Sequence, residues 1–323
     1  MPVHAFIFPG QGSQSVGMGR DLAAAFAPAR EVFEEVDETL KQKLSKLMFE
    51  GPGEELTLTE NAQPALMAMS LATLRVLETE GGFRLRDRAV VVAGHSLGEY
   101  SALAAAGAFD IAEAARLLRL RGQAMQKAVP AGEGAMAALI GVDLEAAQAI
   151  CDAAAPVPDA EDHAREVVEP ANDNGGGQVV ISGHRGAVER AIEAAKARGV
   201  KRAMLLPVSA PFHSALMAPA ADAMAEALAN TPPRAPAVPL IANVSAAKAT
   251  APSDIVSLLV QQVTATVRWR ESVQAMTALG VDSFIELGAG KVLSGLVRRI
   301  APDVAVAAAG TPAEIESLLK ALA

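Results

Sequence analysis

A serine between two glycines, in the pentapeptide GHSLG at residues 94–98, is the feature that most restricts the fold of this chain. An apolar run precedes it, from Val90 to Ala93, and a helix of small residues is predicted to begin at Gly98. A serine at so sharp a strand-to-helix turn has its hydroxyl raised above a sheet, and only glycine leaves room for the backbone on either side. We therefore predict that Ser96 is accessible at the end of a buried strand.

Apolar runs and helical patterns alternate on both sides of this turn. Residues 3–8 and 88–93 are predicted as buried strands, and residues 61–80 and 110–128 as helices, the second opened by a capping box of Asp110 with Glu113. A helix over 214–230 and strands over 238–244 and 281–287 continue the pattern. Strands that alternate with helices indicate an α/β fold with a mainly parallel sheet covered on both faces.

A different order of elements separates the two halves of this pattern. Strands are predicted at 134–141, 166–172, 178–183 and 201–208, with helices at 144–154 and 187–199. The order β-α-β-β-α-β is that of ferredoxin-like folds. We therefore predict a small ferredoxin-like subdomain at residues 130–202, inserted into a catalytic subdomain formed by residues 1–129 and 203–323. Residues 156–166 are expected to form a surface excursion of the small subdomain.

Charge and composition argue against several classes of protein. The formal net charge of −9 and the pI near 5.2 disfavour binding to nucleic acid or to an anionic membrane surface, because both need clustered positive charge. No apolar run reaches the roughly 18 residues of a membrane span. The single cysteine, Cys151, suits a reducing compartment, and the N-terminus lacks the features of a signal peptide. We expect a soluble cytoplasmic protein.

Two glycine-rich segments fail the tests for nucleotide-binding motifs. GAGKVLSG has Ile285 and Val292 where a P-loop needs a glycine and a serine or threonine. GQGSQS has Ser15 at the position of the third glycine in a dinucleotide-binding fingerprint. A nucleotide-binding function is therefore disfavoured.

Ser96 needs a base if it is to act as a nucleophile, and its plainer role is to cap the helix. Among five histidines we favour His213, which lies between a strand end and a helix start where the chain returns from the small subdomain. Arg121 shares a helical face with apolar residues, whereas Arg116 and Arg119 can point to solvent. Such an arginine either pairs with an internal carboxylate or holds a substrate carboxylate with its fork, and spacing alone leaves both roles open.

Seven segments along the chain carry a resemblance to a known family. In order they are FPGQGSQ, GHSLGEYSAL, LRGQAMQ, NDNGGGQVVISG, PVSAPFHS, VRW and ELGAGKVLSGL. The chain resembles the malonyl-CoA:acyl carrier protein transacylases of fatty-acid synthesis over essentially its whole length. The resemblance implies an α/β-hydrolase-like large subdomain with an inserted ferredoxin-like small subdomain, in agreement with the element order.

The resemblance also implies roles for individual residues in the reaction. Ser96 matches the acylated nucleophile and His213 its base. Gln262 matches the residue whose backbone carbonyl orients the histidine in place of the usual aspartate. Gln11 and the backbone N–H of Leu97 match the oxyanion hole.

Other positions match residues that contact the substrate. Arg121 matches the residue that binds the malonyl carboxylate. Of the two roles that its spacing leaves open, the resemblance therefore favours binding of a substrate carboxylate over pairing with an internal one. Asn172 and Asn174 match a polar loop that faces the site. Phe212, a bulky ring directly before the histidine, is expected to crowd an α-methyl branch and so to favour malonyl over methylmalonyl groups. Three positions depart from the proline that the family tends to have, and they are Gly176, Thr266 and Ala289.

The implied function is transfer of malonyl from malonyl-CoA to acyl carrier protein, with neither a cofactor nor a metal, by a monomer. A stand-alone acyltransferase of a polyketide assembly line and a serine thioesterase are the alternatives. Because carrier proteins are generally acidic, docking needs a local basic surface. The candidates, which a solvated helix face would equally explain, are Arg185, Arg190, Lys196, Arg198, Lys201 and Arg202.

Overall fold

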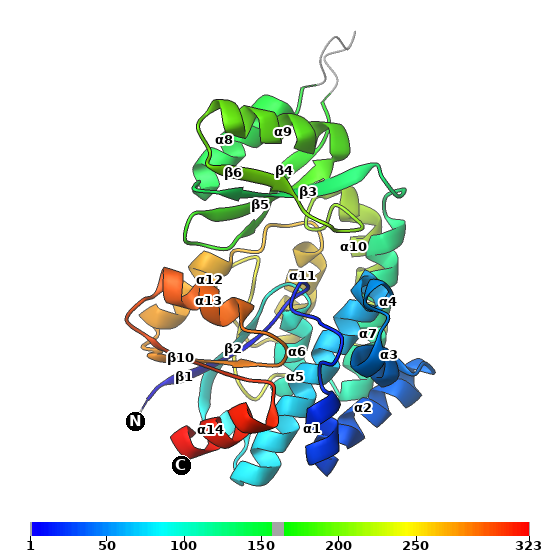
Figure 1. Ribbon diagram of the computed structural model, residues 1–323, viewed down its shortest axis with the longest axis vertical. Helices are drawn as coiled ribbons and strands as arrows, with labels where there is room; N and C mark the ends of the chain where they lie inside the picture. The colour runs from blue at the N-terminus through cyan, green and yellow to red at the C-terminus, as the bar shows by residue number, and fades with distance from the viewer. Residues whose placement is uncertain (1, 157–164, 323) are drawn as a thin grey trace.

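A six-stranded sheet forms the centre of the larger part of the molecule (Figure 1). The computed structural model describes residues 2–156 and 165–322. Strand order is β10-β9-β1-β2-β7-β8, and every pair is parallel except β7 with β8. The strands are β1 (His4–Phe8), β2 (Ala89–Gly94), β7 (Leu240–Ile241), β8 (Lys248–Ala249), β9 (Ser283–Leu287) and β10 (Ala305–Ala309).

Helices cover both faces of this sheet because alternate strand residues point to opposite sides. Phe6 and Phe8 of β1 belong to one apolar cluster, whereas Ala5 and Ile7 belong to another. The first cluster takes residues from α1 (Arg20–Ala25), α2 (Ala27–Leu40), α3 (Leu44–Glu50), α4 (Gly53–Thr57), α5 (Thr59–Gly81), α6 (Gly98–Ala105), α7 (Ile111–Lys127), α10 (Ala218–Asn230), α11 (Pro252–Gln262) and α14 (Pro312–Leu322). The second takes residues from α12 (Trp269–Ala278) and α13 (Val292–Ile300). Short 3-10 turns lie at Leu85–Asp87 and Ala215–Met217.

The small subdomain forms the upper part of the molecule in Figure 1. Its four antiparallel strands have the order β4-β5-β3-β6, with bounds Val168–Asp173, Gln178–His184, Gly134–Ile140 and Arg202–Leu205. Helices α8 (Leu144–Ala154) and α9 (Arg185–Ala197) pack on one face and close a separate apolar cluster. The chain order β3-α8-β4-β5-α9-β6 confirms the predicted α/β fold with its ferredoxin-like insertion.

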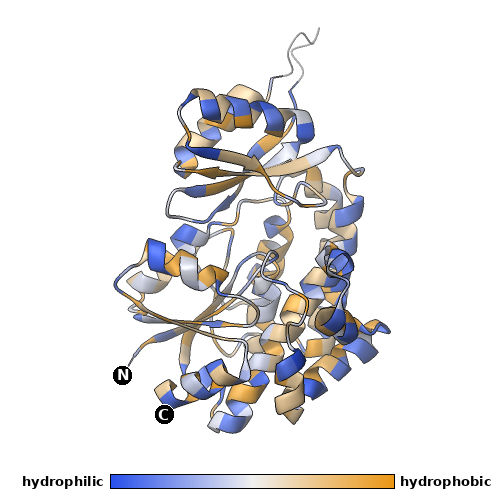
Figure 2. Cartoon of the chain, in the orientation of Figure 1, coloured by the Kyte–Doolittle hydropathy of each residue, from blue (hydrophilic) through white to orange (hydrophobic). Residues whose placement is uncertain are grey.

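Hydropathy follows this layering. In Figure 2 the strands of both sheets are mainly apolar, and the helices carry apolar and hydrophilic stripes side by side. None of the helices within residues 2–156 and 165–322 has the length and apolar character needed to span a bilayer.

Some predicted boundaries differ from the structure. The strand expected over 238–244 is only Leu240–Ile241, and the one expected over 201–208 is Arg202–Leu205, so the small sheet extends past residue 202. The capping box of Asp110 with Glu113 is present at the start of α7. Most of the excursion predicted at 156–166 lies outside the described residues.

Candidate active site

The turn between β2 and α6 is built on close backbone contacts. A Cβ added at Gly98 would lie 2.3 Å from the carbonyl oxygen of Phe8 in β1, and one added at Gly94 would lie 1.9 Å from the carbonyl carbon of Gly98. Between them Ser96 has a φ of 54°, in the left-handed region that non-glycine residues rarely adopt. The glycines therefore allow a tight turn that holds the partly exposed Ser96 above the sheet.

Ser96 and His213 are in hydrogen-bond contact, although 117 positions separate them. The Oγ of Ser96 lies 2.7 Å from Nε2 of His213, and Nδ1 of His213 lies 2.8 Å from the backbone oxygen of Gln262. Because a carbonyl oxygen only accepts, Nδ1 carries the proton and Nε2 accepts from the serine. Burial, followed by the charge of Arg121, lowers the pKa of His213 to about 3. The histidine is thus neutral and able to take the serine proton.

Arg121 reaches the same serine from α7. Its Nη2 donates to Ser96 Oγ at 3.2 Å and to Gln262 Oε1 at 2.9 Å, and its Nη1 donates to Gln63 Oε1 at 2.8 Å. The residue is 1% exposed, and Nε has no hydrogen-bond partner. Within the described part of the chain no carboxylate forms an ion pair with Arg121. A cation buried in this way is suited to an anionic group brought by a substrate.

The loop after β1 closes over the nucleophile turn. A Cβ at Gly10 would lie 2.6 Å from the backbone oxygen of His95, so Gln11 follows a point of direct contact with that turn. The side chain of Gln11 accepts a hydrogen bond from Thr59 Oγ1 at 3.0 Å. In residues 2–156 and 165–322 no acceptor contacts the backbone N–H of Gln11 or of Leu97. Both donors are available for a substrate oxygen.

Two polar residues that sequence reasoning missed, Asn243 and Glu99, hold the backbone of Ser96 together with the side chain of Gln262. Asn243, after β7, accepts the Ser96 N–H at 2.8 Å through Oδ1 and donates to the backbone oxygen of Gly94 at 2.7 Å. The side-chain nitrogen of Gln262 donates to the Ser96 oxygen at 2.9 Å and contacts Glu99. Glu99 directly follows the GHSLG motif and is the one charged residue of α6, a buried helix, which is a signal that could have identified it.

The two predicted asparagines have different places in the structure. Asn174 follows β4, and its Oδ1 lies 2.9 Å from Nε2 of His95, the neighbour of Ser96. Asn172 lies within β4, where it pairs with Val180 and forms a bridge with Val267. Asn172 therefore lies in the strand predicted over 166–172, and not in the loop that the resemblance implies, because β4 extends to residue 173.

Three other residues singled out from the sequence, Phe212, Arg119 and Thr266, have different surroundings. Phe212 is almost fully buried directly before His213. The prediction that Arg119 points to solvent is wrong, because its guanidinium contacts Asn61 at 3.0 Å and Gln42. Thr266, one of the departures from proline, donates to the backbone oxygen of Pro170 at 2.6 Å. That contact helps to join the two subdomains.

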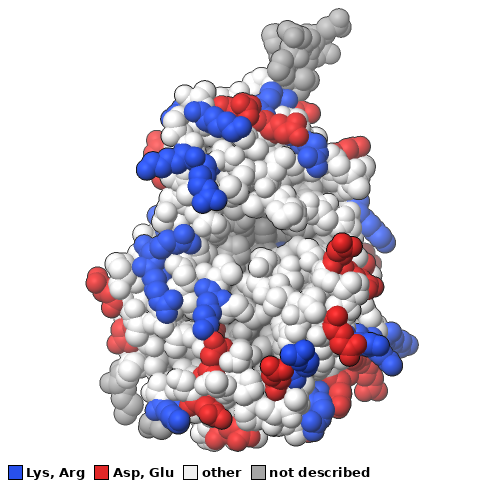
Figure 3. Space-filling view, viewed as in Figure 1, with Lys and Arg blue, Asp and Glu red and all other residues white. Residues whose placement is uncertain are grey.

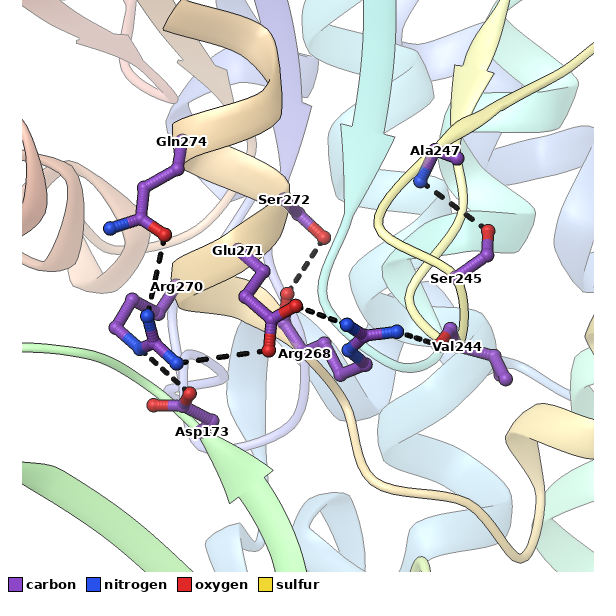
Figure 4. Close-up of polar contacts among 9 residues, drawn as sticks. All are labelled: Asp173, Val244, Ser245, Ala247, Arg268, Arg270, Glu271, Ser272 and Gln274. Carbon is purple, nitrogen blue, oxygen red and sulfur yellow. Dashed lines mark hydrogen bonds and ion pairs between the residues drawn. The ribbon is translucent and has the colours of Figure 1, made fainter. Parts of the chain in front are cut away.

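A joint of backbone and ionic contacts fixes β4 to the large subdomain. Val267 donates to the oxygen of Ala171 at 2.9 Å, and Asp173 donates to the oxygen of Val267 at 2.9 Å. Arg270 of α12 binds the Asp173 carboxylate at 2.8 Å (Figure 4). The end of β4, and with it Asn174, is therefore held in a fixed place beside the nucleophile turn.

Comparisons with known proteins agree with this geometry. The Acyl transferase domain family matches residues 5–309. The malonyl CoA-acyl carrier protein transacylase of Bacillus subtilis is 47% identical over 318 residues, covering 98% of this chain and 96% of the relative. The protein of the same name from Escherichia coli K12 is 46% identical over 320 residues, covering 99% and 100%. The chain belongs to the malonyl CoA-acyl carrier protein transacylase family.

Solved structures of the transacylase family superpose closely on this chain. The acyl-carrier-protein S-malonyltransferase of Bartonella henselae has a TM-score of 0.94 at 56% identity, covering 99% of each chain. A malonyl-transacylase solved in complex with its type II PKS acyl-carrier protein has a TM-score of 0.93 at 43% identity, again covering 99% of each chain.

The basic side chains predicted to dock an acidic carrier differ in whether they already form ion pairs within the protein. Figure 3 shows Lys and Arg gathered on the left of one face, above and below a central hollow. Of the predicted docking residues, Arg190 pairs with Glu166 at 2.9 Å and Lys196 with Glu193 at 2.7 Å. Arg185 lies 3.8 Å from a carboxylate oxygen in the same helix. For the other three, Arg198, Lys201 and Arg202, no ion pair is found within the described ranges.

Proposed function

We propose that this protein transfers the malonyl group from malonyl-CoA to the phosphopantetheine thiol of acyl carrier protein through a malonyl-Ser96 intermediate. One observation carries this proposal: the buried guanidinium of Arg121 lies 3.2 Å from the nucleophilic oxygen and has no carboxylate bound to it within the described residues. An acyl group that ends in a carboxylate supplies the missing anion while its thioester carbonyl reaches Ser96.

The first half of the reaction uses His213 as a base. It takes the Ser96 proton through Nε2 as Oγ attacks the thioester carbonyl, and Nδ1 keeps its hydrogen bond to the Gln262 oxygen. The backbone N–H groups of Gln11 and Leu97 donate hydrogen bonds to the carbonyl oxygen and stabilise the negative charge that develops on it. Breakage of the carbon–sulfur bond releases CoA, whose thiolate takes the proton from His213.

The second half reverses these steps with the carrier's thiol. His213 accepts the thiol proton, the sulfur attacks the ester carbonyl of malonyl-Ser96, and Ser96 leaves with the proton from His213. The two N–H groups stabilise the same charge a second time. No group is oxidised or reduced, and the chain needs no further reactant.

Binding of the malonyl carboxylate also activates the base. The charge of Arg121 is the second cause, after burial, of the low pKa of His213. A carboxylate on Arg121 cancels part of that charge, so the pKa of His213 rises when the correct acyl group is bound. The site is therefore a stronger base with malonyl-CoA than with acetyl-CoA.

Two other activities fit the serine and histidine. A thioesterase would use the same pair, but it would leave the buried Arg121 without a role. Transfer to the carrier of a polyketide assembly line involves the same chemistry, and a relative solved with such a carrier is similar to this chain. Carrier preference, measured with both kinds of carrier, distinguishes the two transferases.

The carrier docks, in this proposal, on basic residues beside the hollow between the subdomains, and the enzyme acts as a monomer. Lys201 and Arg202 are better probes of docking than Arg190 and Lys196, which are held by carboxylates. Charge reversal at Lys201 and Arg202 should raise the Michaelis constant for the carrier and leave that for malonyl-CoA unchanged. Equal effects on both constants would count against this surface.

Intact-protein mass spectrometry tests the proposed reaction directly. After mixing with malonyl-CoA, the wild type should gain one malonyl group and Ser96→Ala should gain none. Addition of phosphopantetheinylated carrier should discharge the adduct onto the carrier. Free malonate without transfer would show a hydrolase, and the absence of any adduct would refute the role of Ser96.

A further inference from the structure

Glu99 is a buried acid that the proposed reaction does not use. It lies in the first turn of α6 and is 1% exposed. One carboxylate oxygen accepts the backbone N–H of Asn243 at 2.8 Å, and the other accepts from the side-chain nitrogen of Gln262. Both partners are donors, so the geometry fits an ionised carboxylate, which only accepts.

The two partners of Glu99 hold the Ser96 peptide groups from both sides. Asn243 Oδ1 accepts the Ser96 N–H at 2.8 Å, and Gln262 Nε2 donates to the Ser96 carbonyl oxygen at 2.9 Å. These contacts fix the backbone groups on either side of a residue whose φ is 54°. Such a backbone conformation persists only where the surroundings hold it, and here both holding residues rest on Glu99.

Glu99 also decides which way the Gln262 amide faces. Because the carboxylate accepts, the amide nitrogen must point toward Glu99, and the amide oxygen is left to accept from Arg121 Nη2 at 2.9 Å. The backbone oxygen of the same Gln262 receives the His213 proton at 2.8 Å. Three groups at the site, the serine, the histidine and the arginine, are therefore oriented through one residue that Glu99 anchors.

We propose that Glu99 is a positioning residue for acyl transfer, whose buried carboxylate holds Asn243 and Gln262 so that Ser96, His213 and Arg121 converge on the acyl group. This inference rests on the proposed function. Glu99 does not touch the reacting atoms, and it acts only through the two residues that it anchors. Loss of its acceptor character leaves a donor facing a donor and loosens the alignment of the site.

Two titratable or charged groups interact electrostatically with Glu99, Tyr100 of the same helix and Arg121 of α7, and two histidines, His95 and His213, belong to the same site. Burial raises the pKa of Glu99 to about 8, lowers that of His213 to about 3, lowers that of His95 and raises that of Tyr100. Arg121 stays charged. Of this group, Glu99 is thus the one that ionises between pH 6.5 and about 9.5. Below its pKa a proton on the carboxyl opposes one N–H donor, and acylation should slow.

The test is the rate of Ser96 malonylation from pH 6 to 9.5, followed by rapid quench and intact mass. In the wild type the rate should rise as Glu99 ionises. Glu99→Gln keeps the shape but presents an NH₂ group to one of the two donors. Its maximal rate should be at least ten-fold lower at pH 9 and should lack the rise.

Glu286→Gln is a matched control for the loss of a buried carboxylate. Glu286 is fully buried and also accepts two N–H groups, those of Leu293 at 3.1 Å and Ser294 at 2.7 Å, at the start of α13. This variant should keep the wild-type pH profile even if it lowers stability.

Each outcome separates the two proposals. A wild type that is never malonylated overturns the proposed function. A malonylated wild type whose rate is flat between pH 6.5 and 9 overturns the role of Glu99 without any need for a variant, and so does a folded Glu99→Gln enzyme with the wild-type profile. Both results leave malonyl transfer itself intact.

Discussion

Replacement of Arg121 by alanine should turn a site selective for malonyl groups into one that accepts neutral acyl groups. The guanidinium is buried, donates to Ser96 Oγ, and has no carboxylate bound within the described residues. Without it, the malonyl carboxylate would be buried beside the amide oxygens of Gln63 and Gln262, which repel it. Acetyl-CoA loses no such contact, so the variant should affect the two substrates very differently.

The size of the change follows from the cost of leaving one partner of a buried ion pair alone. That cost is roughly 3–5 kcal/mol, which corresponds to a loss of about two to nearly four orders of magnitude in malonyl-over-acetyl selectivity. Part of the fall should come from His213. Without Arg121 the charge that lowers the pKa of His213 is absent with both substrates, so the neutralisation of that charge by malonyl no longer favours malonyl over acetyl. Arg121→Lys keeps the charge without the fork and should lie between the wild type and alanine.

Competition between malonyl-CoA and acetyl-CoA for Ser96, read by intact mass, measures this selectivity. Arg119→Ala is the matched control, since it removes an arginine of the same helix whose guanidinium contacts Asn61 and Gln42 and not Ser96. The control should keep the wild-type ratio. An Arg121→Ala enzyme that still prefers malonyl-CoA by the wild-type factor would refute the assignment of Arg121 as the carboxylate-binding residue.

Three further changes test other parts of the site. The pKa of His213 is about 3 in the folded protein and near 6.5 when unfolded, so below pH 6.5 the unfolded chain binds a proton that the folded one rejects. The wild type should therefore lose about 1.4 kcal/mol of stability per pH unit relative to His213→Gln as pH falls toward 4, and parallel denaturation curves would contradict this. Gly98→Ala places a Cβ 2.3 Å from the Phe8 oxygen. It should lower the free energy of unfolding by about 1–3 kcal/mol, measured by thermal unfolding, and abolish malonylation of Ser96. Wild-type stability and wild-type malonylation would show that the turn can relax. Phe212→Ala should raise use of methylmalonyl-CoA relative to malonyl-CoA by roughly 10- to 200-fold, and an unchanged ratio would remove Phe212 from the acyl pocket.

Much of the fold was predictable from the sequence because its signals are local. Within the GHSLG turn Gly94 packs against Gly98 four positions on, and the capping box of α7 depends on residues three positions apart. The small subdomain was recognised from the order of its strands and helices, which the chain carries in sequence. Short strands were the weak point: β7 was predicted too long, because apolar residues in the following connection resemble a strand.

The convergence of the site was decided by tertiary structure alone. Gln262 meets His213 across 49 positions and Ser96 across 166, and Asn243 meets Ser96 across 147. The pairing of β2 with β7 brings Asn243 beside the nucleophile turn, and no periodicity along the chain encodes that neighbour. Arg119 was misjudged for the same reason, since the residues that contact it come from α5 and from the turn between α2 and α3.

The sequence by itself determined the nucleophile turn, the α/β layering and the insertion, because steric limits and apolar periodicity act between residues close along the chain. Only the folded structure decided which polar groups face one another in the interior. There each buried donor and acceptor must find a partner, and the partner is set by strand order and not by distance in sequence. Glu99 is the clearest case. In the sequence it is one acidic residue on a predicted helix, whereas in the structure it binds Asn243 and Gln262, the residues that hold Ser96.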